Sequence, residues 1–374
     1  MNDRISRREF LKAVTRWGVL GSFLFFPSFS ASCSFLNRKD HLIDRKKGSI
    51  FYAQKSLGYY FYIIQQEAMR REVERRGYKL YSSVSNLNTT QQVNQIKEAA
   101  KKKPVAIICN PVSSGQTFAE VLTDIKRRGI PVGIVDTPLT NGEVSITVSF
   151  DNFKGGQMAA EKLVSLLQEK YGEPRGTILN CYGDLNSYAW QLRKQGFESV
   201  IGKYKNINLV CRLLLEKNTK MYDATYSTLQ KYPHLDGIHA PSETPARGIY
   251  EALKSLNRLF PVEDKKHIFF VTIDGEPIAH QWIKEGILDA SISQDPIAYS
   301  EICIDLLDSY ILKDKPIPEE NYRNEKYYFK EAEFRKTSVG PHLTIPPFEI
   351  NDENVDDQRL WANIAHREWG ISYI

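Results

Sequence analysis

The stretch PVAIICNPVSSGQTFAEVLTDIKRRGIPVGIVD, residues 104–136, decides the fold class of this chain. Two short apolar runs, 105–109 and 132–135, flank the segment 115–128, where apolar residues recur at helical spacing until Gly129. A strand, an amphipathic helix and a second strand in this order are typical of a βαβ unit with parallel strands. The stretch therefore predicts a parallel sheet covered by helices.

The same alternation extends back from this unit and starts again at residue 152. Before the unit, we expect strands and helices in the order 49–53, 59–76, 79–82 and 89–102. In the second half, we expect helices at 153–170, 187–202, 219–231 and 244–256, with strands at 176–180, 208–214, 237–240 and 268–273. The pattern predicts an α/β protein with two doubly wound parallel-sheet lobes. A cleft between them would face the carboxyl ends of the strands, where ligands collect.

The first 33 residues resemble a targeting segment, so we keep them apart from the fold. Residues 6–12, SRREFLK, match the twin-arginine export pattern S-R-R-x-F-L-K, and the apolar run that follows is too short to span a bilayer. Residues 30–33, SASC, resemble a lipobox in which Cys33 is lipidated, although Ser30 stands where Leu is usual. A general signal peptide and simple cleavage after small residues are the alternatives.

Charge and motif content argue against two other classes of protein. The formal net charge is +5, of which residues 1–32 carry +3, so the remainder offers no basic surface for nucleic acid. The sequence contains no GxSxG, HExxH, Walker or GxGxxG motif, and the His and Cys residues lack metal-ligand spacing. We therefore expect no enzyme activity, no cofactor and no metal. The loop at 352–363 begins like a calcium loop, but Asp357 and Asn363 replace the required Gly and Glu.

Seven phrases in order along 48–336 resemble the type I periplasmic binding proteins, in the ribose-binding-like sugar branch. They are GY at 77–78, IICNP at 107–111, GIPV at 129–132 with Asp136, FDN at 150–152 with GG at 155–156, Arg193 with GF at 196–197, DG at 274–275 with Pro277, and SISQ at 291–294. The resemblance implies two lobes that close on a sugar outside the cytoplasmic membrane. It also implies an ABC-type importer as the partner.

The resemblance carries the polar ligand-binding residues of the family to positions in this chain one at a time. Asn110 and Asp136 would lie at strand ends of lobe 1, where an ionised Asp136 would accept hydrogen bonds from two hydroxyls. Arg193 would donate to ring and hydroxyl oxygens from lobe 2. Asp274 and Gln294 would complete the polar cage.

Aromatic side chains are expected to form the other wall of the cleft. Phe61 and Tyr62 match, by position, two aromatics that stack on the apolar faces of the sugar in the family. They belong to the run YYFY at 59–62, and four successive helical residues cannot all point one way. Trp190 should face the same cleft by its spacing from Arg193.

Several positions depart from the ribose-type pattern. Phe150 replaces a Ser, while Thr137 and Gln191 stand where the family usually has Arg. Ser242 begins the triplet SET where the family has NDE, and we still expect Ser242 to reach the ligand. The loss of two arginines argues against an anionic ligand. The expected ligand is a neutral polyol other than ribose.

Three chain crossings should join the lobes, near 150–152, 293–296 and 321–326. The expected domains are therefore lobe 1 at 48–150 plus 295–323, lobe 2 at 151–294 plus 324–338, and an extension at 339–374. The extension carries Trp361 and Trp369 among apolar residues at helical spacing, so we expect it to pack near the hinge as a brace. A docking surface for a partner is the alternative.

We expect a monomer in the periplasm or cell envelope that hands its ligand to a membrane permease. Lipid on Cys33 would anchor it there. A periplasmic sensor that presents the ligand to a membrane kinase or chemoreceptor is the alternative. Transcription regulators of the lactose-repressor type share the core, but they need an N-terminal helix-turn-helix where this chain carries its export signal.

Overall fold

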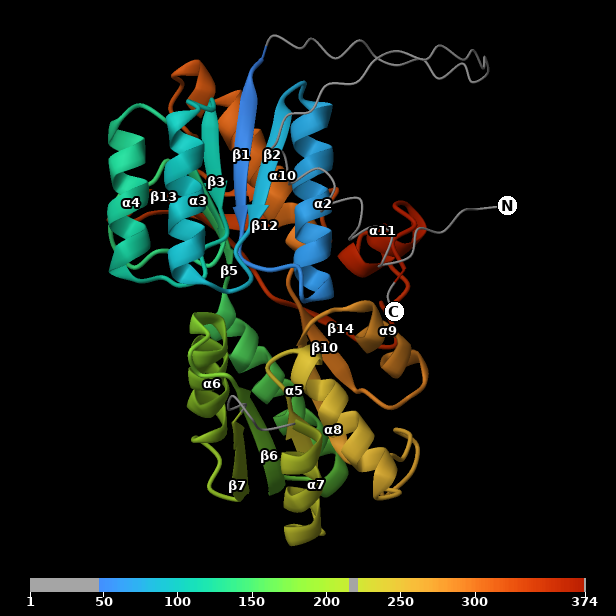
Figure 1. The fold of residues 1–374 in the computed structure, drawn as a ribbon. Coiled ribbons are helices and arrows are strands. Elements are labelled where there is room, and N and C mark those ends of the chain that lie inside the picture. Colours follow the sequence, from blue (N-terminus) through green and yellow to red (C-terminus); the bar gives the residue numbers. More distant parts are fainter. Residues whose placement is uncertain (1–46, 215–220, 373–374) are drawn as a thin grey trace, which may run out of the picture.

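The computed structural model describes residues 47–214 and 221–372. The expected export signal and the expected lipidation site Cys33 lie outside this part of the chain. Figure 1 shows two α/β lobes, one above the other, with the chain passing between them at the middle. The α/β class with two parallel-dominated sheets is confirmed.

Lobe 1 is built on an eight-stranded sheet in the order β11-β12-β13-β5-β4-β3-β1-β2. Its strands are β1 (Ser49–Gln54), β2 (Lys79–Val84), β3 (Ala106–Cys109), β4 (Val132–Asp136), β5 (Ile146–Phe150), β11 (Tyr322–Arg323), β12 (Glu331–Lys336) and β13 (Pro341–Ile345). Its helices are α2 (Tyr60–Arg75), α3 (Thr89–Lys101), α4 (Gln116–Arg127), α10 (Pro296–Ser309) and the 3-10 turn η1 (Ile311–Lys313). Alternate strand residues supply separate cores beneath α2 and α10 on one face and beneath α3 and α4 on the other.

Lobe 2 is built on a six-stranded sheet in the order β14-β10-β9-β8-β6-β7. Its strands are β6 (Gly176–Gly183), β7 (Ile207–Leu214), β8 (Gly237–His239), β9 (Phe269–Asp274), β10 (Ala290–Ser293) and β14 (Phe348–Ile350). Its helices are α5 (Asn152–Tyr171), α6 (Tyr188–Ile201), α7 (Met221–Lys231), α8 (Glu243–Ser255) and α9 (Pro277–Lys284), and α11 (Trp361–Arg367) follows β14.

The βαβ unit expected at 104–136 is present as β3, α4 and β4. Every residue of β3 is buried, and β3 pairs in parallel with β1 on one side and β4 on the other. Such a strand is covered on both faces, which explains why its sequence is a continuous run of apolar residues. After α4 the chain turns at Gly129, whose φ of 85° favours glycine.

The first two expected crossings are confirmed, but the third is wrong. The chain leaves lobe 1 between β5 and α5 and returns between β10 and α10. The third crossing lies at Pro346 and Pro347, between β13 of lobe 1 and β14 of lobe 2, and not at 321–326. Two prolines in succession cannot donate to a ladder, so they end one strand before the chain enters the other sheet.

The placement of 324–338 in lobe 2 is therefore also wrong. Strand β12 pairs antiparallel with β13, and β13 pairs in parallel with β5, so all three belong to the lobe 1 sheet. Likewise, 339–374 is not a separate extension over its whole length, because β13 and β14 complete the two sheets.

Only the part after β14 stands apart from the sheets. In Figure 1, α11 lies beside the lower end of α2 and near α9, at the junction of the lobes. Across the described residues, we find no helix with the length and apolarity needed to cross a membrane.

Candidate ligand-binding cleft

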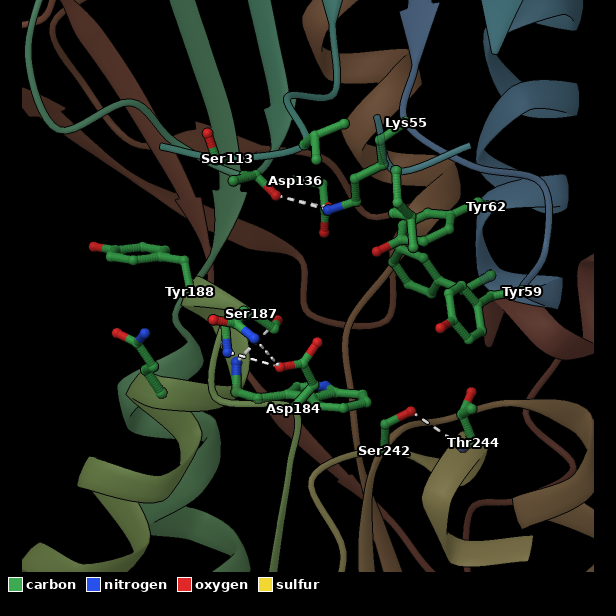
Figure 2. A pocket seen from close by; sticks show the side chains of 18 of the residues that line it. Lys55, Tyr59, Tyr62, Ser113, Asp136, Asp184, Ser187, Tyr188, Ser242 and Thr244 are labelled. Atoms are coloured by element: carbon green, nitrogen blue, oxygen red, sulfur yellow. Dashed lines mark hydrogen bonds and ion pairs between the residues drawn. The ribbon is translucent and has the colours of Figure 1, made fainter. Parts of the chain in front are cut away.

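A cleft of about 560 Å³ separates the lobes, which is the size range of small-molecule sites. Figure 2 shows Lys55, Tyr62 and Asp136 from lobe 1 facing Asp184, Ser187 and Ser242 from lobe 2. The lobe 1 lining comprises Lys55, Tyr59, Phe61, Tyr62, Leu87, Thr89, Val112, Ser113, Ser114, Asp136 and Thr137. The remaining lining comprises Asp184, Asn186, Ser187, Tyr188, Ala189, Trp190, Gln191, Arg193, Ser242, Thr244, Asp274, Glu276 and Gln294.

The polar wall of lobe 1 is centred on an ion pair. Lys55 follows β1 and its Nζ lies 2.7 Å from Oδ2 of Asp136, the last residue of β4. The same ammonium donates to Oγ1 of Thr137 at 2.8 Å and lies 4.9 Å from the centre of the Tyr62 ring. Burial opposes the charged form of Lys55, but the Asp136 carboxylate outweighs it and raises the pKa of the lysine. Lys55 is therefore a fixed cation at the cleft wall.

The start of α2 supplies the aromatic wall. The ring centres of Phe61 and Tyr62 are 5.6 Å apart at 82°, and Phe61 is also supported edge-on by Tyr299 at 6.2 Å. Burial raises the pKa of Tyr62 to about 12, so its hydroxyl stays protonated and can donate a hydrogen bond. Trp190 of α6 lines the cleft from lobe 2, with its ring against Gly183. A Cβ at Gly183 would lie 2.4 Å from that ring, so glycine is needed there.

Arg193 and Asp274 form the polar centre of lobe 2. Arg193 Nη1 lies 2.8 Å from Oδ1 of Asp274, and Nε donates to Asn152 Oδ1 at 2.8 Å. Gln294 donates its amide to the same Asp274 oxygen at 2.5 Å and is itself held by the Tyr299 hydroxyl at 2.7 Å. Burial raises the pKa of Asp274, and Arg193 opposes this shift. Both partners are thus oriented by the protein before a ligand arrives.

Two close helix contacts explain why Arg193 lies where it does. A Cβ on Gly156 of α5 would lie 2.0 Å from the carbonyl oxygen of Arg193, and one on Gly196 of α6 would lie 1.9 Å from that of Phe153. Only glycine allows the two helix backbones to approach this closely. The GG and GF phrases therefore place the backbone of Arg193 against α5.

Eight of the nine predicted ligand residues line the cleft: Phe61, Tyr62, Asp136, Trp190, Arg193, Ser242, Asp274 and Gln294. Asn110 does not, and this expectation is wrong. Its side chain is fully buried and its amide donates to Gln65 of α2 at 2.8 Å and to Gln54 at 3.3 Å. Gln54 and Gln65 therefore hold the Asn110 side chain in a hydrogen-bond network that links the end of β3 to α2, behind the cleft wall.

Sequence reasoning missed several lining residues. Lys55 directly follows a strand at the same sheet edge as Asp136, a position that could have identified it. Glu276 lies two residues after Asp274 and is almost fully buried, with Arg247 at 3.3 Å. Two tyrosines with hydroxyl groups also line the cleft at helix starts. Tyr59 precedes α2 in lobe 1, and Tyr188 begins α6 in lobe 2. No metal-binding group of three or more ligands occurs in the part of the chain that the structure describes.

Two α/β lobes whose polar and aromatic walls face one another across a cleft define a hinged, two-lobe ligand-binding protein. Comparison with known proteins agrees with this class. The periplasmic binding protein domain family matches residues 50–315. The chain belongs to this family, in its type I sugar-binding branch.

Individual relatives are similar at low identity. The D-apiose import binding protein of Actinobacillus succinogenes is 26% identical over 200 residues, which are 53% of this chain and 63% of that relative. The ribose import binding protein RbsB of Bacillus subtilis is 22% identical over 269 residues, 72% of this chain and 83% of RbsB.

Solved structures share the fold. A carbohydrate transporter solute-binding protein from Agrobacterium radiobacter, in complex with D-arabinose, has a TM-score of 0.69 at 15% identity and covers 85% of this chain and 99% of its own. A solute-binding protein from Bacillus halodurans with bound myo-inositol also has a TM-score of 0.69, at 19% identity. It covers 84% of this chain and 98% of its own.

Proposed function

We propose that this protein captures a neutral sugar or related polyol between its lobes and delivers it to an ABC-type importer. The pair of Arg193 and Asp274 carries the proposal, because it presents donors and an acceptor to the cleft from buried, preoriented side chains. Sugar hydroxyls both donate and accept, and they bind most strongly to ionised partners. The aromatic rings of Phe61, Tyr62 and Trp190 suit the apolar C–H faces of a sugar ring.

Charge in the cleft supports a neutral ligand. Lys55 is paired with Asp136, and Arg193 is paired with Asp274. An anionic ligand would have to compete with these carboxylates for both cations, which is costly in a buried site. The relatives named for D-apiose and ribose, and the structures with D-arabinose and myo-inositol, support a polyol of this size. A few such hydrogen bonds are consistent with micromolar binding, about −8 kcal/mol.

Thermal shift measurements with the purified protein test this function. The panel contains D-apiose, D-ribose, D-xylose, D-arabinose, D-allose and myo-inositol. A ligand at 100 times its dissociation constant adds about 2.7 kcal/mol to stability, which is a clear rise in melting temperature. The expected responder is a sugar or inositol other than ribose, with Asp136→Ala losing the response. A panel without any responder would contradict the sugar assignment.

Transport and sensing can be separated in cells. If the protein serves an importer, deleting its gene abolishes uptake of the responding sugar. Uptake that persists, together with loss of a transcriptional response to the sugar, would support a sensor instead.

We also infer that the chain is exported as a folded monomer through the signal at 6–12 and anchored by lipid on Cys33. The signal sequence supports this, as does the family, whose members act outside the cytoplasmic membrane. Replacing Arg7 and Arg8 with lysine should stop export, and Cys33→Ser should move the exported protein from the membrane fraction to the soluble fraction. A Cys33→Ser protein that stays in the membrane fraction would contradict the anchor.

A further inference from the structure

Trp361 lies between the two lobes, although it comes from a segment beyond the family match at 50–315. Its side chain is fully buried, and its ring centre lies 6.0 Å from that of Tyr60 and 5.9 Å from that of Phe61, both in α2 of lobe 1. Its indole Nε1 donates a hydrogen bond of 3.1 Å to the main-chain carbonyl of Asp274 in lobe 2. One side chain therefore contacts a cleft-lining residue of each lobe.

The carbonyl that accepts this hydrogen bond belongs to Asp274, whose backbone is strained. Asp274 has a φ of 126°, which residues other than glycine rarely adopt, while its carboxylate faces the cleft. Such a conformation persists only where the surroundings hold it. Arg193 and Gln294 hold the carboxylate of Asp274, and Trp361 holds its carbonyl.

Glu276 makes a second connection between the lobes. In the described structure, Tyr59 precedes α2 without a side-chain capping hydrogen bond. The buried carboxylate of Glu276, in lobe 2, accepts a hydrogen bond from the main-chain amide of Phe61 in the first turn of α2. A carboxylate at this position satisfies a free helix amide and interacts favourably with the helix dipole. Lobe 2 thus caps a helix of lobe 1.

The segment that carries Trp361 is attached on both sides. The Tyr60 hydroxyl of lobe 1 donates to the carbonyl of Ile371 at 3.0 Å. On the lobe 2 side, Lys284 of α9 pairs with Asp356 at 2.8 Å. Separating α2 from β9 would therefore break either the ring contacts of Trp361 or its hydrogen bond.

We propose that Trp361 is a positioning residue of the binding cleft. By joining α2 to Asp274, it sets the distance between the aromatic wall and the polar centre of lobe 2 before any ligand binds. It also resists opening of the lobes on this side of the cleft. The proposal rests on the proposed function only in taking this cleft as the binding site, because the placement of the lobes is a property of the protein without ligand.

Trp361→Phe tests this role because it retains an aromatic ring and removes the N–H donor. Trp282→Phe is the matched control, since Trp282 is also buried, with 3% of its surface exposed, but stacks on Tyr250 at 4.8 Å within lobe 2. Both proteins are measured at full length without ligand, by amide hydrogen exchange and small-angle X-ray scattering. A failure of the sugar panel would leave this measurement intact.

In Trp361→Phe, we expect amide exchange in 60–64 and 274–276 to accelerate together by about tenfold, with a larger radius of gyration. Trp282→Phe should lower the melting temperature and change neither readout. Glu276→Gln keeps the shape of the side chain and weakens the second connection between the lobes. It should accelerate exchange of the same amides by a smaller factor. If Trp361→Phe matches Trp282→Phe in exchange and in scattering, the proposal is overturned.

Discussion

The Nζ atom of Lys55 lies 2.7 Å from Oδ2 of Asp136 and joins the ends of β1 and β4 on the lobe 1 wall of the cleft. Thr137 also bonds Oδ2, at 3.3 Å. Within the described residues these contacts engage one carboxylate oxygen, which leaves Oδ1 to accept from a ligand hydroxyl. The pair thereby fixes the direction of an acceptor and keeps this part of the cleft neutral.

Lys55→Met should destabilise the protein by about 3 kcal/mol, because it leaves the largely buried Asp136 charge without its partner. Adding Asp136→Asn should recover most of that loss, since neither charge then remains. Urea unfolding of the two single variants and the double variant gives the coupling energy. Additive losses would show that the two side chains do not interact.

Arg193→Lys should weaken ligand binding by about 100-fold, because a single ammonium cannot replace the planar guanidinium that bonds both Asn152 and Asp274. Arg193→Ala should also destabilise the ligand-free protein by about 3–5 kcal/mol by leaving Asp274 unpaired. Calorimetry with the responding sugar and urea unfolding separate the two effects. If Arg193→Lys bound the sugar with wild-type affinity, Arg193 would not be a ligand-binding residue.

Glu276 gives a pH dependence of stability with a definite sign. Burial raises its pKa to about 7, above that of an unfolded glutamate near 4.3. Its stabilising contribution is therefore complete below about pH 4.3 and is lost as the pH rises through about 7. From pH 4.5 to pH 8, the free energy of unfolding of Glu276→Gln should rise by about 3 kcal/mol relative to that of the wild type. Urea unfolding at both pH values measures this, and parallel stability curves would contradict it.

Gly196→Ala should destabilise the protein by about 3 kcal/mol, because the new methyl group would meet the Phe153 carbonyl at 1.9 Å and push α6 away from α5. Gly115→Ala is the control, since its nearest neighbour, the Ser113 hydroxyl, lies 3.6 Å away and its φ is −74°. The control should change the melting temperature much less. Equal effects of the two substitutions would argue against the close helix contact.

The parts of the fold that the sequence predicted are those with strong local signals. Strands such as β3 are continuous apolar runs, and helices such as α4 bury one face, so both are visible without tertiary information. Strands β13 and β14 are short and flank Pro346 and Pro347 in a polar region. Their pairing with β5 and β10 depends on residues almost 200 and about 60 positions away, which no local pattern reports.

The residues of the candidate site likewise divide into those with a local signal in the sequence and those without one. Asp136, Arg193 and Asp274 could be predicted because strand ends and helix–helix glycines place them at the cleft edge. Asn110 also directly follows a strand, β3, but the orientation of its side chain depends on Gln65, a partner on another element. The roles of Lys55 and Glu276 likewise depend on neighbours that are distant in sequence.

Isothermal titration calorimetry of the purified protein with the sugar panel tests the central claim most directly. We predict one-to-one binding of a neutral pentose, hexose or inositol with a dissociation constant of about 10 μM or below. The same titration with Asp274→Asn should weaken binding by about 100-fold, because the carboxylate that pairs with Arg193 is lost. The absence of binding by every neutral polyol, or equal affinity in Asp274→Asn, would contradict a sugar held between the two lobes.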